Sequence, residues 1–157
     1  MKNPKVLTIL GLFLLGAAPS LHAACSAATA AGAYGFTTAG TLILPNVGPA
    51  PVAAVGSITF QLNGDVSGSQ DRSVGGAFAH ETITGTLTVN AGCTTVLLAN
   101  VYDNNGNLVR TSTIDGVIVN NGKEIRAIFE SVVAKPSGAV LPAILTIEAV
   151  RIHGHSG

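Results

Sequence analysis

Apolar and polar residues alternate one by one along much of this chain, most clearly over residues 81–102. Ile83 and Leu87 fall on one side of this run, and a series of threonines falls on the other. A side-chain period of two is typical of a β-strand with one buried face. The Asn90-Ala91-Gly92 break is too short for a helix, so we predict that the strand beginning at Cys93 returns antiparallel as a hairpin.

The same alternation predicts eight strands in all, joined mostly by short turns. The predicted strands are Tyr34–Leu44, Val52–Leu62, Val66–Val74, Phe78–Val89, Cys93–Tyr102, Leu108–Val119, Glu124–Ala134 and Ala143–Ile152. Asn-Gly pairs at 63–64, 105–106 and 121–122 are typical of two-residue hairpin turns. We predict a lead-in tail at residues 26–32 and a loop in the proline-rich segment Pro45–Pro51.

Sequential strands with hairpin connections and no long crossover predict an all-β fold, an eight-stranded antiparallel up-and-down barrel. Closing the sheet removes the exposed edges that long strands rich in Thr and Val would otherwise present. A barrel of this size is filled by its own side chains or holds one small ligand. A two-sheet β-sandwich is the alternative fold, because strand number and turn spacing are compatible with both.

The first residues have the pattern of a secretory signal peptide. Lys2 and Lys5 precede an apolar run, Val6–Ala18, and small residues follow it. The apolar run is too short for a comfortable membrane span, so we expect no stable span after signal cleavage. We therefore predict a signal peptide at 1–23 and a single β-barrel domain at 24–157 that is secreted or periplasmic.

The two cysteines fit an exported protein. Cys25 lies just past the predicted cleavage site, so the alternative is a lipoprotein anchored through Cys25; we favour soluble export because His22 stands where a lipoprotein signal has leucine. An oxidising compartment predicts one disulfide between Cys25 and Cys93. In the chain-entropy model a loop of this length stabilises the fold by about 4 kcal/mol. A free reactive thiol is the weaker alternative, because neither cysteine has a base beside it in sequence.

Charge and composition exclude some partners. Lys2 and Lys5 leave with the signal, so six Lys and Arg residues remain against eight Asp and Glu. A slightly acidic chain lacks the excess of basic residues that binding to nucleic acid requires. Charged residues make up only 10% of the sequence, but Val, Ile, Leu and Thr are abundant, so we expect a folded chain and not a disordered one.

A resemblance to known proteins rests on residues spread over nearly the whole mature chain. These residues are Cys25, Ala31–Phe36, Gly40-Thr41, Gly85–Asn90, Cys93-Thr94 and Val101–Asp103. In them the chain resembles a group of uncharacterised small exported bacterial β-barrel proteins. More distantly it is similar to lipocalin-like and allene-oxide-cyclase-like (dirigent-like) barrels, which hold apolar small molecules. The resemblance implies a secreted β-barrel and carries over no catalytic residue.

Charged residues on the seventh predicted strand are the first candidates for a site. Arg126 and Glu130 alternate with Ile125 and Phe129, so one pair faces the lumen and the other faces solvent. We predict that the apolar pair faces inward and that the charges form a solvated exterior. The inverted arrangement would make Arg126 and Glu130 a binding pair in the lumen.

Other polar candidates have weaker patterns. Arg110 also points either into the lumen or toward solvent, and the sequence leaves both possibilities open. Arg151 is predicted to lie at a rim of the barrel. His80 and Glu81 are predicted to be surface residues and not an acid–base pair. His153 and His155 near the terminus make a poor metal site. We predict no catalytic residue, no metal site and no cofactor.

These observations favour an exported, non-enzymatic β-barrel that binds a small apolar ligand. The predicted ligand-binding residues are Ile83, Leu87, Leu97, Ile125, Phe129 and Ile147. One alternative is a structural or interaction protein with a side-chain-filled barrel. Another is a barrel-cyclase-type enzyme, which needs an inward polar group such as Arg126 or Glu130. The segment Val96–Val101, apolar on both faces, predicts a ligand cavity or a homo-oligomer interface.

Overall fold

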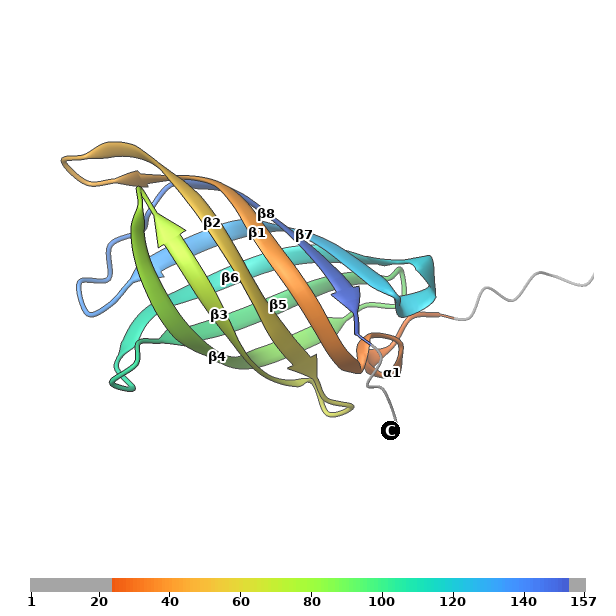
Figure 1. The fold of residues 1–157 in the computed structure, drawn as a ribbon. Coiled ribbons are helices and arrows are strands. Elements are labelled where there is room, and N and C mark those ends of the chain that lie inside the picture. Colours follow the sequence, from red (N-terminus) through yellow and green to blue (C-terminus); the bar gives the residue numbers. More distant parts are fainter. Residues whose placement is uncertain (1–23, 153–157) are drawn as a thin grey trace, which may run out of the picture.

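The computed structural model describes residues 24–152, which form one closed barrel of eight antiparallel strands (Figure 1). The elements are α1 (Ala27–Ala30), β1 (Gly32–Leu44), β2 (Gly48–Phe60), β3 (Asp65–Val74), β4 (Ala77–Val89), β5 (Thr94–Tyr102), β6 (Leu108–Val119), the 3₁₀ turn η1 (Asn120–Gly122), β7 (Glu124–Ala134) and β8 (Ala143–Arg151). Each strand pairs with its neighbour in sequence, and β8 pairs with β1. The predicted up-and-down barrel is confirmed, and the sandwich alternative is wrong. The predicted signal peptide at 1–23 lies outside the described residues.

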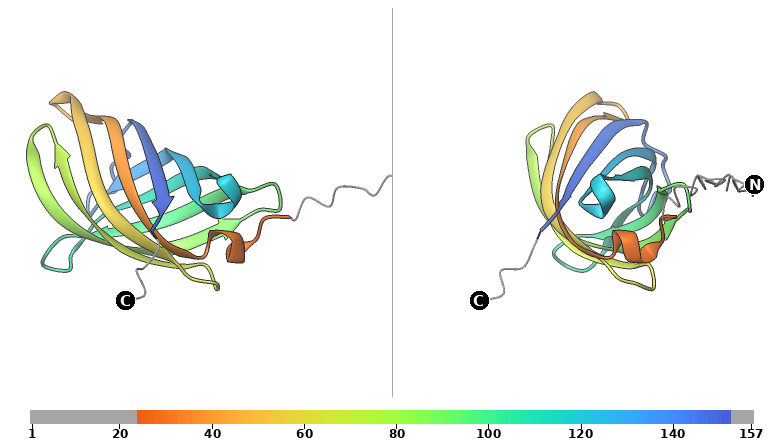
Figure 2. Two further views of the ribbon diagram at one scale, coloured as in Figure 1. Left: turned by 45° about the vertical axis from the view of Figure 1, so that its right-hand side comes forward. Right: turned by 90° about the vertical axis from the view of Figure 1, so that its right-hand side faces the viewer.

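The two ends of the barrel differ. The connections β1–β2, β3–β4, β5–β6 and β7–β8 gather at one end, which we call the loop end (Figure 1). The other end, which we call the closed end, carries α1, η1 and the remaining turns (Figure 2). This division follows from an up-and-down order, in which successive turns alternate between the two ends.

The hydrophobic core lies inside the barrel because one face of every strand points inward. Ile83 and Leu87 of β4 are buried, whereas the threonines between them are exposed. The same alternation buries Phe36 and Ile58 on β1 and β2. A side-chain period of two therefore produces an apolar lumen and a polar outer wall.

The segment at residues 26–32 is not the predicted tail. Ala27–Ala30 form the single turn α1, and the N–H of Ser26 donates to the Thr29 hydroxyl at 3.1 Å, as in a capping box. Ala30 is fully buried in the core. The predicted disulfide between Cys25 and Cys93 is confirmed, and it ties this segment to the β4–β5 turn. The helix exists because its apolar side packs against the closed end, a tertiary contact that local sequence does not reveal.

The predicted loop at Pro45–Pro51 is also partly wrong, because β2 already begins at Gly48. Pro49 and Pro51 pair with β1, whereas pairing with β3 begins only at Val52. The Pro51 carbonyl accepts from the Gly75 N–H, so its backbone faces the β3 side. A proline has no N–H to donate. At Pro49 and Pro51 the missing N–H would point toward β3, which is not paired with β2 at these positions, so no hydrogen bond of the sheet is lost, as at a sheet edge.

The Asn-Gly pairs do mark turns, but the turns are longer than the predicted two-residue hairpins. The connections span 61–64 and 103–107, and η1 occupies the third. Of the three Asn-Gly pairs, only Asn121-Gly122 has positive φ at both residues, 56° and 79°. Side-chain hydrogen bonds shape the other turns; Asp103, for example, accepts from two backbone N–H groups within its own loop.

Candidate functional site

The lumen contains two chambers in line along the barrel. An inner chamber of about 70 Å³ lies toward the closed end, and an outer chamber of about 220 Å³ lies toward the loop end; both are partly enclosed. Thr38, Gln70, Arg110 and Phe129 line both chambers and so form the partition between them. An engineered cavity of about 150 Å³ holds benzene, so only the outer chamber has room for an organic ligand.

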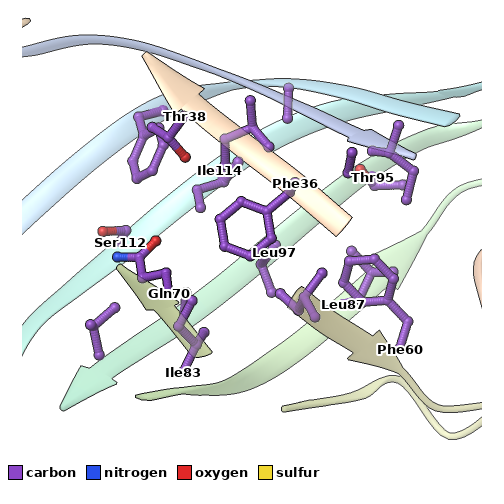
Figure 3. A pocket seen from close by; sticks show the side chains of 18 of the residues that line it. Phe36, Thr38, Phe60, Gln70, Ile83, Leu87, Thr95, Leu97, Ser112 and Ile114 are labelled. Atoms are coloured by element: carbon purple, nitrogen blue, oxygen red, sulfur yellow. The ribbon is translucent and has the colours of Figure 1, made fainter. Parts of the chain in front are cut away.

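The six residues predicted to bind a ligand all line the inner chamber. They are Ile83, Leu87, Leu97, Ile125, Phe129 and Ile147. Phe36 and Phe60 also project into this space (Figure 3). The residues are thus brought together as predicted, but around the smaller space, and their binding of a ligand stays a prediction.

The outer chamber is lined mainly by residues that sequence reasoning did not select. Its apolar walls consist of Leu42, Leu44, Val52, Ala54, Val74, Val109, Val132, Ala134, Leu141 and Leu145, with the shared Phe129. Most of these residues continue the inward-facing set of their strand toward the loop end. Extending the alternation to the strand ends would have found the residues on β1, β2, β3 and β8, although not the empty space between them. It would have missed Val132 and Ala134, because a bulge in the β6–β7 pairing shifts the inward-facing positions of β7 after Phe129.

A buried ion cluster forms the floor of the outer chamber. Glu81 of β4 is only 2% exposed. Its carboxylate accepts from Arg110 Nη1 and Nη2 at 2.6 and 2.8 Å, from Arg72 Nη2 at 2.8 Å and from Gln70 Nε2 at 2.7 Å. Gln70 lies opposite Glu81 in the β3–β4 register, and Arg110 reaches across from β6. Donors from two strands, β3 and β6, thus hold the carboxylate that β4 carries.

The surroundings of Glu81 keep it ionised. Burial raises the pKa of Glu81, but hydrogen bonds from Arg110 and Arg72, the charge of Arg110 and the Gln70 amide together lower that pKa to about 2. Both carboxylate oxygens are already engaged by guanidinium donors. Such a group is a fixed charge and a poor proton acceptor at neutral pH.

The prediction that Glu81 is a surface residue is wrong. Glu81 has the same strand parity as Ile83 and Leu87 and therefore faces the lumen with them. That parity was the available signal. The partner of His80 is Asp71, 2.8 Å away, and both of these residues are exposed on the outer wall, as expected for a surface histidine.

Arg126 and Glu130 face outward, as the apolar facing of Ile125 and Phe129 requires. The side chain of Arg126 is 62% exposed and pairs with Glu124 at 2.6 Å. The polar lumen group that an enzyme alternative needs is thus not supplied by this strand. It comes instead from the cluster around Glu81.

Arg151 lies at the closed end, where its guanidinium is surrounded by neutral acceptors. It donates to the backbone carbonyls of Thr29, Ala31 and Gly122 and to the hydroxyl of Tyr34. The Tyr34 hydroxyl in turn donates to the Gly122 carbonyl at 2.7 Å. Burial raises the pKa of Tyr34, and the nearby Arg151 opposes this effect. These contacts join β1, β8, α1 and η1 and close this end of the barrel.

Among the buried side-chain nitrogen and oxygen atoms of the described residues, one has no hydrogen-bond partner. It is the hydroxyl oxygen of Ser112, a residue that is 4% exposed and lines the inner chamber. Ser112 follows Arg110 by two positions on β6 and so points into the same lumen. Figure 3 shows it on the chamber wall with Gln70 and Thr38. A buried hydroxyl without a partner costs free energy, so the inner chamber keeps one unused hydrogen-bonding group on its wall.

Residues 24–152 contain neither a cluster of metal-binding side chains nor a helix of membrane-spanning length. No group of three or more His, Cys, Asp or Glu side chains in this part of the chain is placed to hold a metal ion. No helix in it is long and apolar enough to cross a membrane. His153 and His155 lie outside the described residues.

No family model matches the chain, and no curated protein or solved structure matches it either. The resemblance to lipocalin-like and dirigent-like barrels therefore stays a prediction.

Proposed function

We propose that this protein is an exported binding protein that holds a small, mainly apolar molecule in the outer chamber. The observation that carries the proposal is the space of about 220 Å³ that reaches the loop end between apolar walls. The signal-peptide pattern and the Cys25–Cys93 disulfide support export, because disulfides are typical of oxidising compartments outside the cytoplasm.

The walls of the outer chamber suit a binding role. Every strand of the closed barrel pairs with two neighbours over at least part of its length, which holds most of the wall in shape without a ligand. The pairing of β7 with β8 covers only Glu124–Ile128, so these two strands are largely unpaired with each other beside the outer chamber. A ligand that buries apolar surface against Leu42, Val52 and Leu145 gains about 25 cal/mol per Å². A mostly apolar pocket with a few convergent polar groups is the usual form of a small-molecule site.

The same geometry favours binding over catalysis. A barrel cyclase of the kind considered above needs an inward proton donor or acceptor, and Arg126 and Glu130 face solvent. Glu81 faces inward, but its oxygens are occupied by Arg72 and Arg110 and its pKa is lowered to about 2. The cluster can hold a charge in place, and it is poorly suited to transfer a proton.

The proposal is tested by filling the outer chamber. Ala54 lines this chamber, whereas its neighbour Ala53 is exposed on the outer wall of the same strand. We expect wild-type protein to bind octanol, measured by isothermal titration calorimetry, and Ala54→Phe to weaken binding about tenfold or more because the ring occupies the space. Ala53→Phe is the matched control and should bind as the wild type does.

Two results would contradict the proposal. One is octanol binding of equal strength in Ala54→Phe and wild type; the other is no binding to wild type. Circular dichroism and melting temperature establish that the Ala54→Phe barrel is folded. Native mass spectrometry of protein purified from the exporting cell adds an independent readout, because a retained molecule appears as added mass that is lost on denaturation.

A further inference from the structure

The floor of the outer chamber carries a net positive charge. Arg72 and Arg110 both line this chamber, whereas Glu81 lines neither chamber. Two guanidinium groups therefore share a single carboxylate, which leaves one positive charge in excess. The carboxylate is 2% exposed, and the Arg72 and Arg110 side chains are 23% and 15% exposed, so the positive side of the cluster faces the open space.

The arginines also keep unused donors. Glu81 accepts from Nε and Nη2 of Arg72 and from Nη1 and Nη2 of Arg110. Within residues 24–152, Arg72 Nη1 and Arg110 Nε have no hydrogen-bond acceptor. A guanidinium has five N–H donors in a planar fork that matches a carboxylate. The floor can therefore accept a second anionic group beside Glu81.

The rest of the chamber does not neutralise this charge. Apart from the two arginines, its lining is apolar except for Thr38 and Gln70, and it includes no Asp or Glu. A partly buried charge without a counter-ion is costly, so a bound anion would gain from pairing there.

We propose that the outer chamber binds an amphipathic anion, whose carboxylate pairs with Arg72 and Arg110 on the floor while its apolar chain contacts the walls toward the loop end. This inference rests on the proposed function, since it names the class of ligand for the same chamber. It excludes an amphipathic cation, which the excess charge would repel.

Three ligands with one chain and different end groups test the charge preference. Octanoate, octanol and octylamine are titrated into wild-type protein by calorimetry at neutral pH, where octanoate is an anion and octylamine a cation. We expect octanoate to bind about tenfold or more tighter than octanol, because a hydrogen-bonded charge pair adds to the apolar contacts. Octylamine should bind more weakly than octanol.

A variant and its matched control locate the effect. Arg72→Gln removes the excess charge and keeps an amide donor near Glu81, so we expect octanoate affinity to fall about tenfold while octanol affinity is unchanged. Arg126→Gln removes a charge from the outer wall and should change neither affinity. If Arg72→Gln does not fold, the affinities of wild-type protein for the three ligands still show whether the chamber prefers an anion.

The failures of the two proposals are distinguishable. If octanol binds as tightly as octanoate, or octylamine binds most tightly, the anionic ligand is wrong and the binding role stands. If neither octanol nor octanoate binds wild-type protein, both proposals fail. If Arg72→Gln leaves the ratio of octanoate to octanol affinity unchanged, Arg72 contributes nothing to the preference for the anion, and the pairing of the carboxylate with Arg72 is overturned.

Discussion

Both ends of the lumen contain partly buried arginines, but the groups that accept hydrogen bonds from the guanidinium differ between the two ends. At the closed end, Arg151 donates to three backbone carbonyls and to the Tyr34 hydroxyl. At the loop end, Arg72 and Arg110 share the carboxylate of Glu81 and still face an open chamber. The first arrangement surrounds the cation with backbone and hydroxyl acceptors, and the second leaves two arginines with unused N–H groups on the lining of a chamber.

This difference separates a structural role from a binding role. Neutral carbonyl acceptors hold Arg151 in place while bringing α1, η1 and β8 together, so the guanidinium ties the end shut. A carboxylate shared by two arginines fixes their positions and does not cancel their charge. We therefore expect substitutions at the closed end to change stability alone and substitutions at the loop end to change ligand binding as well.

The largest loss of stability is expected from removing the disulfide at the closed end. The double variant Cys25→Ser, Cys93→Ser should lose about 4 kcal/mol of unfolding free energy, because the unfolded chain regains the entropy of a long loop. Urea denaturation measures the loss, and reduced wild-type protein serves as the control that should match the variant. Equal stability of the variant and the oxidised wild type would show that the bond does not constrain the chain.

Glu81→Gln should cost somewhat less, about 3 kcal/mol at neutral pH, because it leaves two arginines without their counter-ion. The folded-state pKa of about 2 lies below the ordinary value of 4.5, so the folded protein binds this proton less tightly than the unfolded chain. The stabilisation from Glu81 is complete above about pH 4.5 and is lost as pH falls toward 2.

Urea unfolding of wild type and Glu81→Gln across this pH range tests the assignment. The difference between the two proteins should shrink as the solution becomes more acidic. Glu130→Gln, an exposed carboxylate on β7, is the control and should stay close to wild type. A difference between wild type and Glu81→Gln that is independent of pH would contradict an ionised Glu81 as its source.

The smallest effect is expected from Tyr34→Phe, about 1–2 kcal/mol. The change removes a hydroxyl that donates to Gly122 and accepts from Arg151, without altering the shape of the ring. Thermal unfolding measures it, and Tyr102→Phe on β5 is the control. Octanol binding should be unaffected, because Tyr34 lines neither chamber; a loss of binding would mean that the two ends are coupled.

Much of the fold could be predicted because its signal is local. Each predicted strand overlaps an observed one, and β6 and β7 have the predicted bounds. The predictions that were wrong concern residues whose structure depends on contacts with parts of the chain that are distant in sequence. The turn α1 forms because Ala30 packs into the closed end, and Pro49 joins β2 because β3 stops short of it. Neither contact can be read from the neighbouring residues.

The candidate site was predicted only in part, for the same reason. The six apolar residues were correctly placed in the lumen because alternation fixes which side of a strand faces inward. Glu81 and Arg110, separated by 29 positions and by the whole of β5, could not be paired from sequence. The charge of the cluster, which decides the proposed ligand class, appears only when β3, β4 and β6 are assembled.

The sequence by itself determined the strand order, the facing of most side chains and the pair of cysteines available for a disulfide, since period-two alternation and short turns act over a few residues. Only the tertiary structure decided which end is closed, where the lumen stays empty and which charges meet there. Those features depend on the register of strands around the closed barrel and on how side chains from opposite walls fill a shared space, which no single strand specifies.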